Sequence, residues 1–219
     1  MSSTTVADTD QSASSPVFGV VTDAQTYQNI LYLFLRFPLG IAYFTLLVTG
    51  FALGVGLTVV LVGFLIFPLI LVGAAYVGAF EVFLANRLLG FDIDYELPAP
   101  NEKPLVDFLK GVLTDVQTYL VIVYLLASFP VGVFLFTLLA IVVSLSLVSI
   151  LAPLLYWLPF AQYEIETVGG VGTIVVDTLP EALVLSVVGF VVALVSLHLC
   201  NVLARGHGHV TAAIFTQNR

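Results

Sequence analysis

The sequence predicts an all-α integral membrane protein whose four transmembrane helices form two tandem helical hairpins. Hydrophobic residues make up 60% of the 219 residues, charged residues only 9%, and the mean hydropathy is +1.12. Soluble domains usually have about 25% charged residues, so this composition excludes a soluble enzyme and a disordered chain. The formal net charge of −8 argues against a nucleic-acid partner, because no basic stripe is present to neutralise phosphates.

The first hairpin follows from the length of a charge-free run. No charged residue occurs in residues 37–80. A single helix of that length would reach about 66 Å, twice the roughly 30 Å hydrocarbon core of a bilayer. The run therefore crosses, turns between residues 54 and 68 where glycines and a proline weaken the helix, and crosses back. We expect spans near 35–57 and 62–85.

The second half of the chain follows a polar connection. Residues 91–112 hold clustered charges and a proline-rich piece (LPAPNEKP), which predicts a water-exposed cytoplasmic connection that ends in a short amphipathic helix. The charge-free run 116–162 predicts a span near 120–147. Residues 163–181 alternate apolar and polar side chains around GGVG, which is typical of a small β-hairpin. The last span is expected near 183–203.

A duplication at a shift of 92 residues is the most informative feature of the sequence. The segment VTDAQTYQNILYLFLRFPLGIAYFTLL (21–47) matches LTDVQTYLVIVYLLASFPVGVFLFTLL (113–139) at 15 of 27 positions. LANRLLG at 84–90 resembles LCNVLARG at 199–206, now at a shift of 115, so the second copy carries an insertion as long as the β-hairpin. With two spans each, the copies are parallel in orientation, which predicts a pseudo-twofold axis along the membrane normal.

The duplication also divides the chain into regions. Repeat one covers 19–90 and repeat two covers 113–206, and together with their connection they form the membrane domain. Residues 1–18 are rich in Ser, Thr and Asp and predict a disordered cytoplasmic tail. Residues 207–219 are expected to form a second cytoplasmic tail.

Each copy opens with Thr-Asp-x-Gln-Thr-Tyr, in which Thr or Asp can cap the N-terminus of a helix. Tyr27 and Tyr119, followed by Tyr32 and Tyr124, suit a membrane interface with the ring in lipid and the hydroxyl in water. The following Phe-Pro-x-Gly is expected to redirect the chain into the membrane. A ligand site at these tyrosines is the alternative to a structural role.

The few basic residues predict the orientation in the cell membrane. All six lie in or beside the N-terminal region, the central connection and the C-terminal region: Arg36, Arg87, Lys103, Lys110, Arg205 and Arg219. The charged residues of the predicted β-hairpin are all acidic. By the positive-inside rule, both termini and the connection are cytoplasmic and the β-hairpin is extracellular.

Glu81 is the one carboxylate within an apolar segment, which makes it a candidate functional residue. It lies six residues before Arg87, so we expect it near the inner headgroups and paired with Arg36 or Arg87. Structural pairing is favoured, and proton sensing or transfer is the alternative.

No metal, cofactor or catalytic site is predicted. His198 is expected at a span end and His207 and His209 in a flexible, solvated piece, and no carboxylate completes a metal-ligand spacing. The sequence contains no GxSxG, HExxH or P-loop motif, so we expect no enzymatic activity. Small-residue pairs such as Gly50/Gly54 allow close helix approach. They favour packing within the bundle, with a homodimer seam as the alternative.

With these features, the chain resembles the putative sensor-domain family. These four-span membrane domains are often placed ahead of histidine kinases in bacteria and archaea, and some stand alone. The resemblance covers roughly residues 20–206 and is carried by YLFLRFPLG (32–40), Phe129-Pro130, Tyr156-x-x-Pro159 and the segment DTLPEA that leads into the last span. It implies a sensory or signalling role with no settled ligand.

We therefore expect a multi-pass membrane sensor or signalling-accessory module without its own kinase. It would act through a separate partner such as a histidine kinase. A stimulus would shift the packing of the repeats, and residues 88–118 and the C-terminal region would transmit the change. Two alternatives stay open. A small transporter or permeation protein would need a polar cavity between the repeats, whereas a structural bundle would act on the lipid bilayer or on a partner membrane protein.

Overall fold

The protein is described from a computed structural model that covers residues 19–97, 104–158, 163–166 and 173–216. The N-terminal tail predicted for residues 1–18 lies outside the described residues. Four helices are long and apolar enough to cross a membrane. They are α2 (Ala24–Gly56), α3 (Gly63–Leu89), α5 (Val116–Ile150) and α7 (Leu179–Phe215). The prediction of four helices long and apolar enough to cross a membrane is confirmed.

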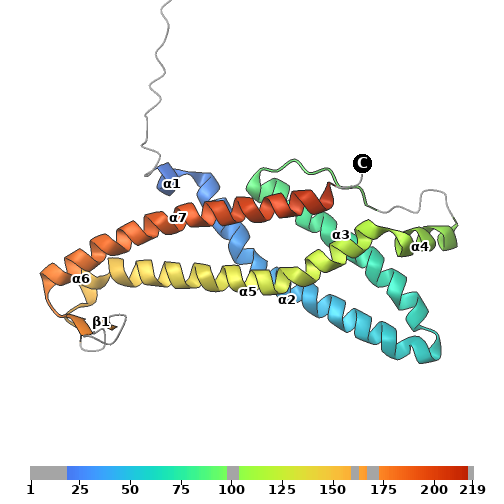
Figure 1. The fold of residues 1–219 in the computed structure, drawn as a ribbon, viewed down its shortest axis with the longest axis horizontal. Coiled ribbons are helices and arrows are strands. Elements are labelled where there is room, and N and C mark those ends of the chain that lie inside the picture. Colours follow the sequence, from blue (N-terminus) through green and yellow to red (C-terminus); the bar gives the residue numbers. More distant parts are fainter. Residues whose placement is uncertain (1–18, 98–103, 159–162, 167–172, 217–219) are drawn as a thin grey trace, which may run out of the picture.

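The described elements lie on two sides of the molecule (Figure 1). The short helices α1 (Gly19–Thr22) and α4 (Leu105–Thr114) and the C-terminal end of α7 lie toward the top of the view. The connection between α2 and α3 and strand β1 (Tyr163–Glu166) lie toward the bottom. The two hairpins diverge from the crossing of α2 and α5.

The first hairpin turns within the range that the sequence predicts. After α2 ends at Gly56, a 3-10 turn (Leu57–Val60) and Leu61, with a φ of 65°, reverse the chain, and α3 begins at Gly63. A Cβ atom at Gly63 would lie 2.1 Å from the Gly54 carbonyl oxygen, so only glycine fits this close turn.

The helices are longer than the spans that the sequence predicts. A helix of 35 residues, such as α5, is about 52 Å long, so it must tilt or extend past the roughly 30 Å hydrocarbon core. The expectation that Phe-Pro-x-Gly redirects the chain is wrong, because Pro38 and Pro130 lie inside α2 and α5. Membrane helices tolerate such prolines when neighbouring helices and local adjustments satisfy the freed backbone groups.

Helices α2 and α5 make the most extensive contact in the molecule, and their backbones touch at two glycines. A Cβ atom at Gly40 would lie 2.6 Å from the Ser128 carbonyl oxygen, and one at Gly132 would lie 2.4 Å from the Arg36 carbonyl oxygen. Each of these contacts has its counterpart at a shift of 92 residues.

Aromatic rings frame this crossing in the same reciprocal way. Phe37 stacks on Phe136 with 4.6 Å between ring centroids, and Phe44 stacks on Phe129 with 4.9 Å. The shift of 92 residues exchanges the two pairs. Backbone contact and ring stacking therefore hold the crossing in the same way on both helices.

Both copies begin with a capped helix, as expected. Asp23 accepts a hydrogen bond from the backbone N–H of Gln25, and Asp115 accepts from those of Gln117 and Thr118. One turn later, Tyr27 and Tyr119 donate their hydroxyl protons to carbonyl oxygens of the preceding short helices, each over 2.7 Å. The same local structure thus starts both repeats.

The second hairpin contains the additional elements. Short helix α6 (Ala152–Leu155) follows α5, and β1 pairs antiparallel with β2 (Thr173–Val176). The GGVG segment that would join the strands lies outside the described residues, so the extracellular β-hairpin as a whole stays a prediction. Helix α7 then starts with a capping box between Thr178 and Glu181.

The flexible piece predicted around His207 and His209 is wrong. Helix α7 continues through both histidines to Phe215, past the boundary at which the sequence predicted a cytoplasmic tail. RGHGHV contains two glycines, which have low helix propensity, but packing overrides that propensity. Phe215 is 1% exposed in the main core, and a Cβ atom at Gly208 would lie 2.4 Å from the Phe91 ring. Helix propensity alone could not reveal this burial.

The small residues on α2 and α3 serve contacts within this chain. Gly50 faces Ile70, and Gly54 faces the ring of Phe67. Gly78 of α3 faces the ring of Phe215. These contacts agree with packing inside the bundle, and a homodimer stays untested.

Candidate functional site

The candidate site is a buried ion pair between α2 and α3. Arg36 and Glu81 are 1% and 0% exposed. The guanidinium binds the carboxylate with both terminal nitrogens, Nη1 to Oε2 at 2.5 Å and Nη2 to Oε1 at 2.9 Å. Ionisable groups are costly within a membrane, and they persist there when they pair with each other and mark functional regions.

Helix α2 places Arg36 on a polar stripe that faces the bundle. The stripe has members at spacings of three, four or seven residues, which lie on one face of a helix. All five are buried: Thr26, Asn29, Tyr32, Arg36 and Tyr43. The side of α2 that faces lipid is apolar, with exposed side chains such as Leu31, Phe34 and Leu46. The polar residues therefore point inward and form contacts between helices.

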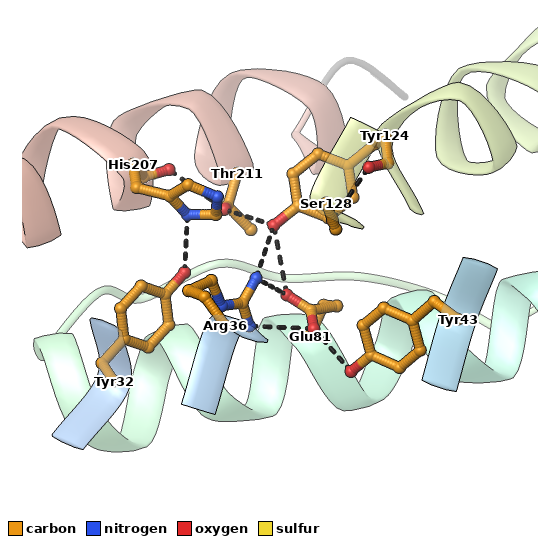
Figure 2. A network of polar contacts seen from close by, with 8 residues as sticks. All are labelled: Tyr32, Arg36, Tyr43, Glu81, Tyr124, Ser128, His207 and Thr211. Atoms are coloured by element: carbon orange, nitrogen blue, oxygen red, sulfur yellow. Dashed lines mark hydrogen bonds and ion pairs between the residues drawn. The ribbon is translucent and has the colours of Figure 1, made fainter. Parts of the chain in front are cut away.

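Two tyrosines complete the coordination of the Glu81 carboxylate (Figure 2). Tyr43 donates its hydroxyl proton to Oε1 over 2.6 Å, and Tyr124 of α5 donates to Oε2 over 3.1 Å. With the two bonds from Arg36, the carboxylate accepts four hydrogen bonds. Its negative charge is thus compensated by one cation and two neutral donors, which is what burial of a charge requires.

Helix α7 joins the network through its last turns. The Tyr124 hydroxyl lies 2.9 Å from Thr211 Oγ1, and the Tyr32 hydroxyl lies 2.9 Å from His207 Nδ1. Each hydroxyl carries one proton. When Tyr124 donates to Glu81, Thr211 must donate to Tyr124 and then cannot also donate to the His207 carbonyl oxygen 3.1 Å away. One connected network therefore links all four long helices.

The guanidinium of Arg36 has further neighbours. It lies over the ring of Tyr32, with 4.6 Å from Cζ to the ring centroid, in cation–π geometry. Nη1 also lies 3.3 Å from the Tyr124 hydroxyl. Nε is buried and has no hydrogen-bond partner within the described part of the chain. Such an unsatisfied donor adds to the cost of this arrangement.

A second polar layer lies closer to the capped ends of α2 and α5. Asn29 donates to Asn201 over 2.8 Å, and Asn201 donates to Thr26 over 3.0 Å, which links α2 to α7. Gln25 donates to the Leu88 carbonyl oxygen, and Gln117 donates to that of Ile214. These side chains fasten the ends of α3 and α7 to the starts of α2 and α5, beside the ion pair.

Of the six candidate site residues predicted from the sequence, the structure brings Arg36 and Glu81 together and leaves Arg87, Tyr27, Tyr119 and His198 apart from them. Of the two partners expected for Glu81, it selects Arg36, whereas Arg87 is exposed in the last turn of α3. Tyr27 and Tyr119 are exposed, and their hydroxyls donate to backbone carbonyl oxygens six residues earlier, in α1 and α4. His198 is also exposed and bonds only within its own helix among the described contacts, with Nδ1 2.9 Å from the Leu194 carbonyl oxygen.

Several members of the network were missed or misplaced by sequence reasoning. The interfacial role expected for Tyr32 and Tyr124 is wrong, because both are buried against the ion pair. Tyr43, His207 and Thr211 were not singled out as site residues. The polar stripe of α2 was the available signal, since its polar residues recur on a face that an apolar bundle would otherwise fill with leucine.

A separate cleft of about 590 Å³ opens beside the N-terminus of α5. Its lining includes the acidic side chains Asp92, Asp94, Glu96 and Asp115. Burial raises the pKa of the Tyr95 phenol in this cleft, and the negative charge of Asp115 raises it further. The cleft therefore presents negative charge at the same end of the bundle as the C-terminus of α7.

The comparison with known protein families agrees with this architecture. The sequence model of a family described as "Sensor: Putative sensor" matches residues 32–214, which contain all eight residues drawn in Figure 2. No curated protein and no solved structure matched the chain. Because the matched segment covers most of the sequence, the chain belongs to the Putative sensor family of multi-pass membrane proteins.

Proposed function

We propose that the protein is a membrane sensor module without enzymatic activity that signals by changing the packing of its two hairpins. The observation that carries this proposal is the buried Arg36–Glu81 pair, whose hydrogen bonds reach all four long helices. A stimulus that alters one helix would thereby alter the others. Family membership supports a sensory role but names no stimulus.

The proposed signal runs from the hairpin ends to the cytoplasmic side. We place the β-strands outside the cell and the connection after α3, together with the C-terminal end of α7, in the cytoplasm, following the distribution of basic residues. The two repeats are related by a pseudo-twofold axis along the membrane normal. The reciprocal contacts at Gly40 and Gly132 support this symmetry, since each contact recurs at a shift of 92 residues.

The Arg36–Glu81 pair suits a switch because partial separation of the two charges is energetically unfavourable. Removing one partner of a buried ion pair costs about 3–5 kcal/mol, because the other charge is left uncompensated. Intermediate separations of Arg36 and Glu81, in which a charge lacks its partner, are therefore disfavoured. We expect the bundle to occupy two discrete packings rather than a continuous range of helix positions. A ligand or stimulus shifts such an equilibrium only when its free energy of interaction differs between the two packings.

The C-terminal end of α7, on the proposed cytoplasmic side, is held against α5 by several contacts. Gln117 and Phe215 hold the end of α7 against α5, and Thr211 of the same helix end bonds to Tyr124. Any rearrangement at Tyr124 would thus act on the last turns of α7. We propose that a separate cytoplasmic signalling protein, such as a histidine kinase, recognises this end of the bundle.

The test is proximity labelling in native cells with a biotin ligase fused to the C-terminus. Three chains are compared: wild type, Glu81→Gln, which removes the charge with little change of shape, and Ser196→Ala as a control in repeat two. We expect the wild type to label a cytoplasmic kinase or response regulator. Glu81→Gln should change the amount labelled at equal membrane abundance, whereas Ser196→Ala should not.

The proposal fails if no cytoplasmic signalling protein is labelled by any of the three chains. It also fails if Glu81→Gln and wild type label the same partner equally at equal abundance. Purely structural destabilisation would lower the abundance of the variant, which immunoblotting of the membrane fraction measures independently.

The alternative of a small transporter is supported only by the presence of polar groups between the repeats. In the described arrangement, Arg36 and Glu81 are fully enclosed and α2 meets α5 through glycine backbones and phenylalanine rings. Transport would require this crossing to open. Ion or solute flux into vesicles that contain the purified chain, absent from protein-free vesicles, would favour that alternative.

A further inference from the structure

Helix α4 carries three distinct stripes along its ten residues. Phe108 and Val112, four residues apart, pack into the main core beside α3. Asp107, Lys110 and Thr114 form an exposed polar stripe at spacings of three and four residues. Packing against the bundle and contact with water thus account for two of the three stripes.

The third stripe is apolar and is not covered by the described part of the chain. Val106 is 73% exposed and Leu113 is 40% exposed, and Leu109, which is half-buried, lies between them on the same face. This stripe lies between the packed face and the polar one, since Val106 is four residues from Lys110. In a water-soluble loop an exposed stripe of this kind would be unfavourable, because apolar surface is driven out of water.

Exposed apolar side chains also occur on α5, which begins two residues after α4 ends. Val116, at the start of α5, is 70% exposed, and Leu120 and Val123 are also exposed further along this spanning helix. The Tyr119 hydroxyl donates to the Leu113 carbonyl oxygen and holds the end of α4 against α5. In Figure 1, α4 lies at the start of α5, on the side of the molecule that also holds α1 and the C-terminal end of α7.

We infer that α4 is a membrane-surface helix that lies in the headgroup layer, with Val106, Leu109 and Leu113 against the acyl chains. Amphipathic helices lie in this layer with their apolar face a few ångströms below the headgroups and their polar face in water. The long stem of Lys110 can extend along the apolar boundary while its ammonium group reaches the water.

A lipid surface fits this stripe better than a protein partner does. Protein interfaces combine an apolar centre with a polar rim, whereas this stripe is followed, after Thr114 and Asp115, by exposed apolar side chains of a helix long and apolar enough to cross the membrane. The occupant is therefore the same bilayer that surrounds α5. This inference does not depend on any signalling role of the protein.

Tryptophan fluorescence tests the inference, because the chain has a single tryptophan. In the full chain carrying Trp157→Phe, one further variant is made at a time: Val106→Trp, Leu113→Trp or, as the matched control on the polar stripe, Asp107→Trp. Each protein is reconstituted into phosphatidylcholine vesicles. Quenching is measured with lipids that carry a nitroxide at a shallow acyl carbon and with acrylamide in the water.

We expect the lipid nitroxide to quench Val106→Trp and Leu113→Trp at least about twofold more strongly than Asp107→Trp, with the order reversed for acrylamide. The inference is overturned if Val106→Trp and Leu113→Trp are as accessible to acrylamide as Asp107→Trp. It is also overturned if both are shielded from both quenchers, because a second copy or another protein segment would then cover the stripe. Val106 lies outside the core, so its replacement leaves the packing intact.

Discussion

The two repeats differ in whether the buried positions of the ion pair carry charge. Ser128 stands in α5 where α2 has Arg36, at the shift of 92 residues, and Ser196 stands in α7 where α3 has Glu81, at the shift of 115. Both serines are buried. Each donates its hydroxyl proton to a carbonyl oxygen four residues earlier in its own helix, over 2.9 and 2.7 Å.

This difference indicates that a hairpin of this kind does not need the charges. In repeat two, neutral serines occupy the equivalent buried positions, and each makes its hydrogen bond within its own helix. A buried ion pair adds little net stability compared with well-packed neutral groups, but it strongly penalises arrangements that separate the charges. The pair in repeat one therefore fits the selection of one packing arrangement rather than the general stabilisation of the fold.

The equivalent tyrosines show how the repeats are coupled. Tyr32 and Tyr124 occupy the same position in the two copies, yet Tyr32 binds His207 and Tyr124 binds Glu81 and Thr211. A hydroxyl of repeat two thus donates a hydrogen bond to the charged carboxylate of repeat one. The asymmetry is concentrated at the contact between the copies, where a change in one can reach the other.

The largest expected effect comes from removing one charge. Glu81→Ala should lower the free energy of unfolding by about 3–5 kcal/mol, because Arg36 is left buried and uncompensated. Ser196→Ala, the matched change in repeat two, should cost about 1 kcal/mol or less. Thermal unfolding in the same detergent or nanodisc measures both. Equal losses would mean that the two repeats do not differ in this respect.

Replacing both charges should recover much of that loss. In the double variant Arg36→Met with Glu81→Leu, no charge remains unpaired, so a double-mutant cycle should give a coupling free energy of about 2–3 kcal/mol. The two single replacements provide the reference for the cycle. Additive losses would show that the two side chains stabilise the bundle independently, against the geometry of their two hydrogen bonds.

The glycines at the crossing should behave alike in the two repeats. Gly40→Ala and Gly132→Ala each force a methyl group into backbone atoms of the other helix and should each cost about 1–3 kcal/mol. Gly73→Ala is the control, because a Cβ atom there would have no neighbour within 4 Å. It should leave stability unchanged or raise it slightly. A large effect at only one of the two crossing glycines would contradict the reciprocal contact.

The helix caps should show the smallest difference. Asp23→Ala and Asp115→Ala should each cost about 1 kcal/mol, as is usual for the loss of an N-cap. The loss should be larger for Asp115, which accepts bonds from two backbone N–H groups and from the Thr118 hydroxyl, whereas Asp23 accepts one backbone bond. Amide hydrogen exchange in the first turns of α2 and α5 measures this local effect. A larger increase in exchange at α2 would reverse the expected order.

The four spans could be predicted because bilayer thickness limits a charge-free run, whatever its neighbours are. The caps could be predicted because they involve residues that are close in sequence. The burial of Tyr32 and Tyr124 could not, since a tyrosine near a span end suits the interface equally well when its helix face is unknown. The extension of α7 through His207 could not either, because it depends on Phe91 packing against Gly208 and on the burial of Phe215.

The most direct test of the central claim is the distance between the outer ends of the two hairpins. Spin labels at Val59→Cys and Leu154→Cys, in a Cys200→Ala background in nanodiscs, report this distance by pulsed electron paramagnetic resonance. We predict that Glu81→Gln shifts or broadens the distance distribution, whereas Ser196→Ala leaves it as in the wild type. Identical distributions in all three proteins would contradict the claim that the ion pair of repeat one sets the packing of the hairpins.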